Sequence, residues 1–165
     1  MTTETKVENH LEAGDYYFDD LEVGDYFHTG KIVITEAHIV AFAGISGDFF
    51  DVHMDDEFAK EQGFSGRIAH GLLGLAMVDG LKNRAAVQLK AIASLGWKNW
   101  DFKGVILPGD RIGAKIQVET KRLTSKKDRG IVSFAFVVTN QHEKIVQQGT
   151  NVLMMRLASN KGSTL

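Results

Sequence analysis

The chain has 165 residues, of which 44% are hydrophobic and 24% are charged, proportions typical of one globular domain with its own core. The formal net charge is −2, and neither a strongly basic run nor an apolar stretch of about 20 residues is found, which argues against a nucleic-acid surface and a membrane span. There is no cysteine, which excludes disulfides, thiolate catalysis and thiolate metal sites.

Both ends of the sequence are polar. Residues 1–14 and 159–165 are expected to form flexible tails, which leaves one domain over residues 15–158. The first ten residues lack the apolar core of a signal peptide, so we expect the protein to be cytoplasmic.

The first half of the domain reads as one strand followed by helices. Residues 26–34 are expected to form a strand. Thr35 is placed to cap a helix whose first turn follows it, and Gly47 is placed to end that helix. Asp55 or Asp56 is then expected to cap a second, short helix.

The second half combines one apolar helix with several strands. A third helix is expected over residues 71–86, and because residues 72–78 are apolar on every side, this helix should be buried all round. Residues 91–157 read as four strands, with apolar and polar residues alternating through residues 112–118. We therefore expect an α+β fold in which an antiparallel sheet of about five strands wraps around a buried central helix.

The stretch from Ile45 to Gly71 carries the residues best suited to chemistry. Asp48 and His53 lie five residues apart, a spacing that suits a curved loop better than one face of a helix. A carboxylate and an imidazole held together can share proton transfer near neutral pH. Gly71 follows His70 at the expected start of the apolar helix, where its N–H could stabilise a developing negative oxygen.

These residues resemble motifs of one known family, the MaoC-like (R)-specific enoyl-CoA hydratases, or hydratase 2 branch of the hotdog fold. Residues 46–53, Ser-Gly-Asp-Phe-Phe-Asp-Val-His, resemble the family signature Ser-Gly-Asp-x-Asn-Pro-x-His. Residues 69–72 are similar to the His-Gly segment that opens the family's central helix. Residues 47–55 fit a variant found in the MaoC-like hydratase domain of the phenylacetate ring-opening enzyme, and residues 102–110 resemble the family's Phe-x-x-Pro-Val-x-x-Gly-Asp turn.

The sequence departs from the family motifs at three positions. Phe50 and Asp51 stand where the family has asparagine and proline, and that asparagine helps to orient the catalytic groups in many members. Val105 stands in place of the proline in the motif of the later turn. The acid and the base of the signature are both kept.

The resemblance implies a hotdog fold and reversible addition of water to a trans-2-enoyl-CoA, giving an (R)-3-hydroxyacyl-CoA. It implies that Asp48 and His53 hold the water and move its protons, and that the Gly71 N–H receives the thioester oxyanion, with His70 and Phe50 near the substrate. It implies no metal or redox cofactor, because coenzyme A enters as part of the acyl-CoA substrate. It also implies a homodimer, sometimes a trimer of dimers.

Two other functions stay open at this point. A hotdog acyl-CoA thioesterase would direct water at the thioester carbonyl, and the Asp48-to-His53 spacing argues against it. A non-catalytic acyl-CoA-binding hotdog protein would explain the altered residues Phe50 and Asp51 as a mark of lost activity.

Several of these residues also have plainer structural interpretations. Asp48 alone would be a loop or capping residue, and His70 could simply stabilise its loop. Asp79 interrupts the apolar helix and needs a partner there, in the pocket, in a second subunit or within the fold. No metal site is expected, because the remaining histidines have no partner at ligand spacing.

Overall fold

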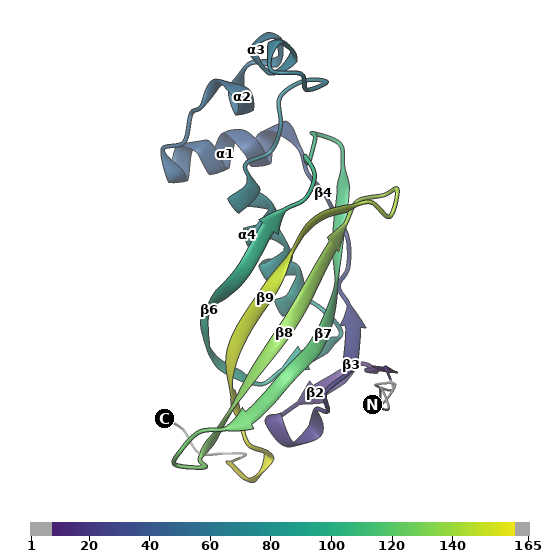
Figure 1. Cartoon of the computed structure of the whole chain (residues 1–165), viewed down its shortest axis with the longest axis vertical. Coiled ribbons are helices and arrows are strands. Elements are labelled where there is room, and N and C mark those ends of the chain that lie inside the picture. The colour runs from purple at the N-terminus through teal and green to yellow at the C-terminus, as the bar shows by residue number, and fades with distance from the viewer. Residues whose placement is uncertain (1–7, 161–165) are drawn as a thin grey trace, which may run out of the picture.

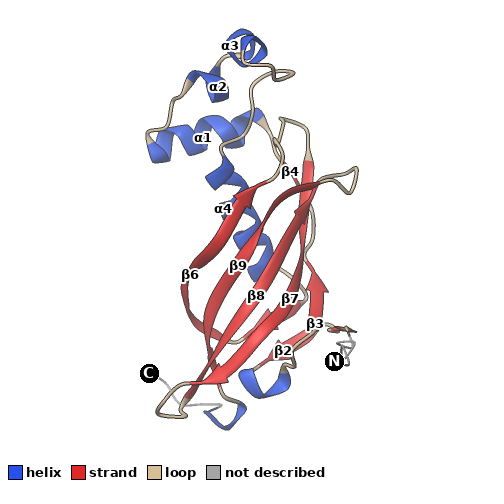
Figure 2. Ribbon diagram, viewed as in Figure 1, coloured by secondary structure: helices blue, strands red, loops and turns tan. Residues whose placement is uncertain are grey.

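A curved sheet of long antiparallel strands wraps past one helix, α4, with shorter helices gathered beyond one end of the sheet (Figures 1 and 2). The structure is a computed structural model, and it describes residues 8–160. The main sheet has seven strands in the order β1-β3-β7-β8-β9-β6, with β4 also pairing with β7. Its strands are β1 (Asn9–His10), β3 (Asp25–His28), β4 (Ile32–Val33), β6 (Ala91–Phe102), β7 (Arg111–Leu123), β8 (Arg129–Thr139) and β9 (Ile145–Arg156).

The remaining elements are short strands, short 3₁₀ turns and four α-helices. A second sheet pairs β2 (Gly14–Tyr16) with β5 (Val87–Leu89), and the 3₁₀ turns are η1 (Phe18–Asp20) and η2 (Ala158–Asn160). The helices are α1 (Glu36–Ser46), α2 (Asp51–Met54), α3 (Asp56–Glu61) and α4 (Gly71–Asn83). Within residues 8–160, no helix is long and apolar enough to cross a membrane.

The helix ends follow local capping rules. The Thr35 side chain accepts a hydrogen bond from the His38 N–H at the start of α1, and Gly47 ends that helix with φ +79°, in the left-handed region that glycine adopts without strain. Asp55 caps α3 by accepting hydrogen bonds from the N–H groups of Glu57 and Phe58. The caps expected at Thr35, Gly47 and Asp55 are therefore confirmed.

The core lies between α4 and the inner face of the sheet. Alternate residues of β8 are buried, as the period of a strand requires, and Phe134 and Phe136 are each 1% exposed. Leu73 and Val78 of α4 belong to the same buried cluster. Burial of these large side chains supplies the main stabilising term for the fold.

The α+β hotdog architecture is confirmed, but several details of the expected fold are wrong. The main sheet has more than about five strands, because short edge strands add to it, and the strand expected over residues 26–34 is split into β3 and β4. α4 ends at Asn83 and is not buried all round: Leu72 is 61% exposed, since the sheet covers only one side of the helix. His53 lies on a one-turn helix, α2, rather than on an irregular segment.

Residues 1–14 are expected to form a tail, but those of them that the structure describes, from residue 8 on, are partly ordered into the fold. β1 pairs in parallel with β3, and Leu11 is 5% exposed and belongs to the core. Residues 158–160 form η2, within the C-terminal segment expected as a tail from residue 159. The rest of both expected tails, residues 1–7 and 161–165, lies outside the described residues.

Candidate active site

Asp48 is placed by the end of α1. Gly47 turns the chain out of the helix, and the Asp48 N–H donates to the Ser46 hydroxyl oxygen at 3.2 Å. The Asp48 carboxylate in turn accepts a hydrogen bond from the Phe50 N–H at 3.3 Å. Asp48 therefore sits on a short, self-bonded bend with its side chain exposed to solvent.

His53 is held on α2 in one tautomer. Its Nδ1 lies 2.8 Å from the Ile68 carbonyl oxygen, and because a carbonyl only accepts, Nδ1 carries the proton and Nε2 keeps a lone pair. Burial lowers the pKa of His53 and the neighbouring His70 lowers it further, while the Ile68 carbonyl and the Asp48 carboxylate oppose that shift. His53 is thus a neutral imidazole with a free proton acceptor near pH 7.

His70 joins the two segments. It precedes α4, is 2% exposed, and its Nε2 lies 2.9 Å from the Asp48 main-chain carbonyl oxygen, to which it donates. Its ring stacks on the His53 ring, with centroids 3.8 Å apart and planes 29° apart. Within residues 8–160, its Nδ1 is the buried side-chain atom without a hydrogen-bond partner. His70 therefore fixes both the Asp48 bend and the face of the His53 ring.

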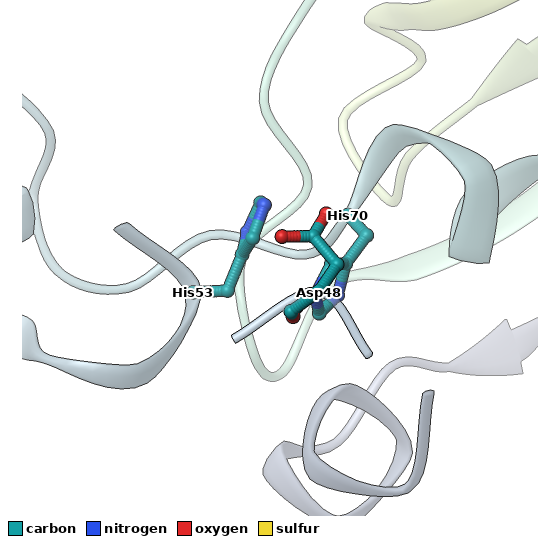
Figure 3. A group of neighbouring side chains, drawn as sticks. All are labelled: Asp48, His53 and His70. Carbon is teal, nitrogen blue, oxygen red and sulfur yellow. The ribbon is translucent and has the colours of Figure 1, made fainter. Parts of the chain in front are cut away.

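The three side chains converge, as Figure 3 shows, with the Asp48 carboxylate pointing toward the His53 imidazole. One ligand-type atom from each residue lies within 4.8 Å of the other two. Imidazole binds a metal in its ring plane at about 2.0–2.1 Å, and the planes of two stacked rings do not meet at that distance from their nitrogens. The arrangement suits proton transfer better than metal binding.

The start of α4 offers main-chain donors beside this cluster. No side chain caps the helix, and within residues 8–160 neither the Gly71 N–H nor the Leu72 N–H donates to a protein acceptor. Such donors at a helix N-terminus favour negative charge. A Cβ at Gly71 would lie 2.4–2.7 Å from three ring atoms of Phe102, so the absence of a side chain lets that ring pack over the helix start.

A cavity of about 360 Å³ lies at this point. It is lined by His53, Gly71, Phe102 and Gln147 together with residues 68–69 and 103–106. Asp48 stands at its margin rather than in its lining, close to His53. An imidazole acceptor and the Gly71 backbone therefore share one cavity, with the carboxylate at its edge.

The structure brings together Asp48, His53, His70 and Gly71, as the sequence predicts. Phe50 lies beside them but not in the cavity lining: it is 58% exposed, and its ring contacts His53 and Phe58 at centroid distances of 6.3 and 5.9 Å.

Some other residues lie away from this cluster, and one residue of the cavity was not predicted from the sequence. Asp79 pairs with the buried ammonium group of Lys82 at 2.6 Å, so its partner lies within the fold. Trp97 and Trp100 pack on each other and on Phe136. Sequence reasoning missed Gln147, whose only signal is an amide side chain beside the apolar Val146 in a strand.

The sequence model of a family described as "MaoC like domain" matches residues 21–141. The chain is 38% identical to Protein MaoC of Klebsiella aerogenes over 122 residues, which are 74% of this chain and 36% of that protein. It is 28% identical to the "(R)-specific enoyl-CoA hydratase" of Aeromonas caviae over 135 residues, 82% of this chain and 96% of that protein. The chain thus spans about a third of the MaoC protein and nearly all of the hydratase.

Solved structures show the same fold. The A. caviae (R)-hydratase superposes with a TM-score of 0.67 at 28% identity, covering 81% of this chain and 96% of that one. Rv0216 of Mycobacterium tuberculosis, described as a double hotdog fold, superposes with a TM-score of 0.79 at 20% identity, covering 93% of this chain and 48% of that one.

Proposed function

Because the chain belongs to the MaoC-like dehydratase family, we propose that it adds water reversibly across the C2–C3 double bond of a trans-2-enoyl-CoA, giving an (R)-3-hydroxyacyl-CoA. One observation carries the proposal: a neutral imidazole acceptor on His53 and the Asp48 carboxylate lie together beside a cavity that also contains the uncapped start of α4. The similarity to a protein named (R)-specific enoyl-CoA hydratase supports it.

Hydration begins with a water held between the Asp48 carboxylate and His53 Nε2. These groups accept one proton from the water as its oxygen bonds to C3. The electrons of the double bond move onto the thioester, whose oxygen becomes negative and accepts hydrogen bonds from the Gly71 N–H and its neighbour. The proton taken from water is then delivered to C2, so water is added and no other reactant is consumed.

The proton is best assigned to the Asp48–His53 pair rather than to one residue. Two titrating groups this close share protons, and the steps belong to the pair. No metal or redox group takes part in this scheme, and coenzyme A enters and leaves as part of the acyl thioester. The acyl chain is accommodated beside Phe102, where the cavity is lined by apolar side chains.

The assembly we propose is a homodimer, with trimers of dimers as a further level. β6 is an edge strand that pairs with β9 alone, so its outer backbone groups have no strand partner within the described sheet. Leu95 on β6 is 48% exposed, and Leu72 on α4 is 61% exposed. A second copy would cover an open strand edge and an apolar face together, and two-fold dimers are the commonest closed assembly.

The test is a panel of short, medium, branched and cyclic enoyl-CoA thioesters, followed by two signals at once. Loss of the conjugated-thioester absorbance reports hydration, and a thiol reagent reports release of coenzyme A. We expect the absorbance to fall without thiol release and the product to be the (R)-alcohol. Thiol release without hydration would show a thioesterase instead, and saturable binding without either signal would show a non-catalytic acyl-CoA-binding protein.

A further inference from the structure

Gln147 on β9 is a buried amide with both of its polar ends in use. It is 1% exposed, its Nε2 donates to the Gly71 carbonyl oxygen at 2.9 Å, and its Oε1 accepts from the Trp100 indole N–H at 3.2 Å. The Trp100 ring packs against Trp97, with centroids 4.9 Å apart. The amide therefore has one orientation, because reversing it would break both hydrogen bonds in a buried place.

The helix leaves room for this amide at one position. A Cβ on Gly74 would lie 2.4 Å from the Gln147 Nε2 and 2.9 Å from the Ile106 Cδ1. Gly74 thus lets α4 and β9 approach closely enough for Gln147 to reach the Gly71 carbonyl. The contact thus depends on both elements: α4 leaves the space at Gly74, and β9 supplies the Gln147 side chain.

The held carbonyl controls the direction of one of the two main-chain donors. The Gly71 carbonyl and the Leu72 N–H belong to the same planar peptide group and point in opposite directions. The preceding peptide group carries the His70 carbonyl and the Gly71 N–H, and that carbonyl accepts from the N–H groups of Leu73 and Gly74 at 3.1 and 3.3 Å. Gln147 therefore fixes the second of two adjacent peptide planes whose N–H groups are uncapped.

Gln147 adds a second support to a backbone that glycine leaves mobile. Gly71 has no side chain to restrict the torsions between the two peptide planes on either side of it. The helix holds the first plane through the His70 carbonyl, whereas the second plane is held both by the helix, which begins at Gly71, and by the Gln147 side chain. Without Gln147, the second plane and the Leu72 N–H that it carries would vary more in direction.

We propose that Gln147 is a positioning residue for the reaction: by holding the Gly71 carbonyl, it aims the Leu72 N–H at the start of α4 toward the thioester oxygen, beside the Gly71 N–H that the helix itself holds. This inference rests on the proposed hydration of an enoyl thioester. Gln147 acts through the Gly71 peptide and takes no part in moving the proton.

The test replaces Gln147 by Met, which has a similar length and makes neither hydrogen bond. Losing an oxyanion donor costs about 10²–10³ in kcat, so we expect a misaimed donor to lower kcat by on the order of 10-fold or more while KM stays nearly constant. Gln148→Met is the matched control, because Gln148 is the next residue of β9 and lies on the opposite face of the strand. We expect its kcat to be that of the parent.

A spectroscopic readout separates positioning from stability. In an Asp48→Asn background, where crotonyl-CoA should bind unreacted, the carbonyl stretching frequency of the bound thioester reports the strength of the donors. We expect Gln147→Met to move that frequency back toward its value in water, and Gln148→Met to leave it unchanged. A parent-like kcat and an unmoved frequency in Gln147→Met would overturn the inference.

Failure of this inference is distinct from failure of the proposed function. If the parent enzyme hydrates enoyl-CoA and Gln147→Met does so equally fast, only the role of Gln147 is wrong. If the parent hydrates no enoyl-CoA, the function itself is wrong. Should Gln147→Met not fold, Trp100→Phe removes the donor that orients the amide and keeps an aromatic ring, and a parent-like kcat and carbonyl frequency in that variant would overturn the inference.

Discussion

The imidazole rings of His53 and His70 stack 3.8 Å apart, and each ring donates to a main-chain carbonyl, that of Ile68 for His53 and that of Asp48 for His70. Two histidines are therefore locked by backbone groups into known tautomers. Only one of them, His53, lines the cavity. The pair works as one reactive ring and one supporting ring.

Asp48→Asn and His53→Ala are each expected to remove most hydration activity. A positioned acid or base contributes about 10²–10⁴ in rate, and Asn at position 48 can still accept the Phe50 N–H, so the bend should keep its shape. Steady-state kinetics with crotonyl-CoA, together with thermal unfolding to confirm the fold, is the measurement. Parent-like turnover in either single variant would contradict the proposed pair.

The double variant Asp48→Asn/His53→Ala tests whether the two groups act as a unit. Both are proposed to act on one water, so removing the second should cost little once the first is gone. Losses that multiply would show two independent roles instead.

The pH dependence of hydration should show an acid limb below the ordinary histidine value. Burial lowers the pKa of His53, so its Nε2 stays an acceptor as the pH falls through about 6.5 and is lost only at lower pH. The logarithm of kcat/KM measured from pH 4.5 to 8 should therefore turn down below about 6.5. A limb at or above that value would contradict the lowered pKa.

The same shift makes a statement about stability. The unfolded chain takes up a proton on His53 near pH 6.5, whereas the folded chain does so only at lower pH, so folding stability falls as the pH drops through this window. Denaturant unfolding of the parent and of His53→Ala at two pH values, one on each side of the window, measures the difference. The variant should lose less stability on acidification.

Gly71→Ala should displace the Phe102 ring. Its Cβ would lie 2.4–2.7 Å from ring atoms that belong to a half-exposed side chain, so the ring can swing away and the fold should survive. We expect lower turnover, because the ring and the new methyl group would both disturb the helix start, and Gly71→Val should be worse. Phe102→Ala added to Gly71→Ala should restore activity in part if the clash is the cause. If the double variant is no more active than Gly71→Ala, the loss of turnover comes from the changed Gly71 backbone and not from the clash with Phe102.

Gly74→Ala and Gly80→Ala should have opposite effects on stability. Helix propensity alone favours alanine at both positions, by about 1 kcal/mol or less. At Gly74 the new Cβ meets the Gln147 amide at 2.4 Å, and overpacking of this kind costs about 1–3 kcal/mol. At Gly80, outside the neighbouring helix backbone, no atom of the described residues lies within 4 Å of the new Cβ, so the gain in stability should appear. Urea titration measures the free energy of unfolding of both variants. Equal gains in Gly74→Ala and Gly80→Ala would show that the close packing at Gly74 has no effect on stability.

Leu95→Glu should weaken association while leaving the protomer folded. Leu95 is on the edge strand β6 and is 48% exposed, so a charge there costs little in the single chain and much in an apolar interface. Light scattering at micromolar concentration is expected to give a dimer mass for the parent and a shift toward the monomer mass of 18.2 kDa for the variant. A monomeric parent would refute the dimer.

Local chemistry was readable from the sequence and long-range packing was not. The caps at Thr35 and Asp55 depend on residues within three positions of them, so the sequence predicts them directly. The Asp48–His53 spacing is local too, and the resemblance to the family's His-Gly segment placed His70 in the same site. The exposure of Leu72 could not be predicted, because two arrangements give the same all-apolar helix sequence: a helix buried on every side, and a helix with one apolar face left open for a partner.

The bond between Gln147 and Gly71 lay beyond sequence reasoning for a different reason. The two residues are 76 positions apart, and their contact depends on the path of every strand between them. A buried glutamine and two helix glycines carry no signal of pairing on their own. The geometry that aims the donors is thus the least predictable part of the site.

That distance along the chain also orders the events of folding. Asp48, His53 and His70 lie in the first half of the chain and leave the ribosome early, whereas the side chain that holds the start of α4 arrives with β9, the last strand. β9 must also pair with β6 across the whole β7–β8 hairpin, a non-local contact of the kind that forms slowly. A partly folded chain would therefore hold the acid and the base before Gln147 supported the start of α4, and full activity would return only with the final closure of the sheet.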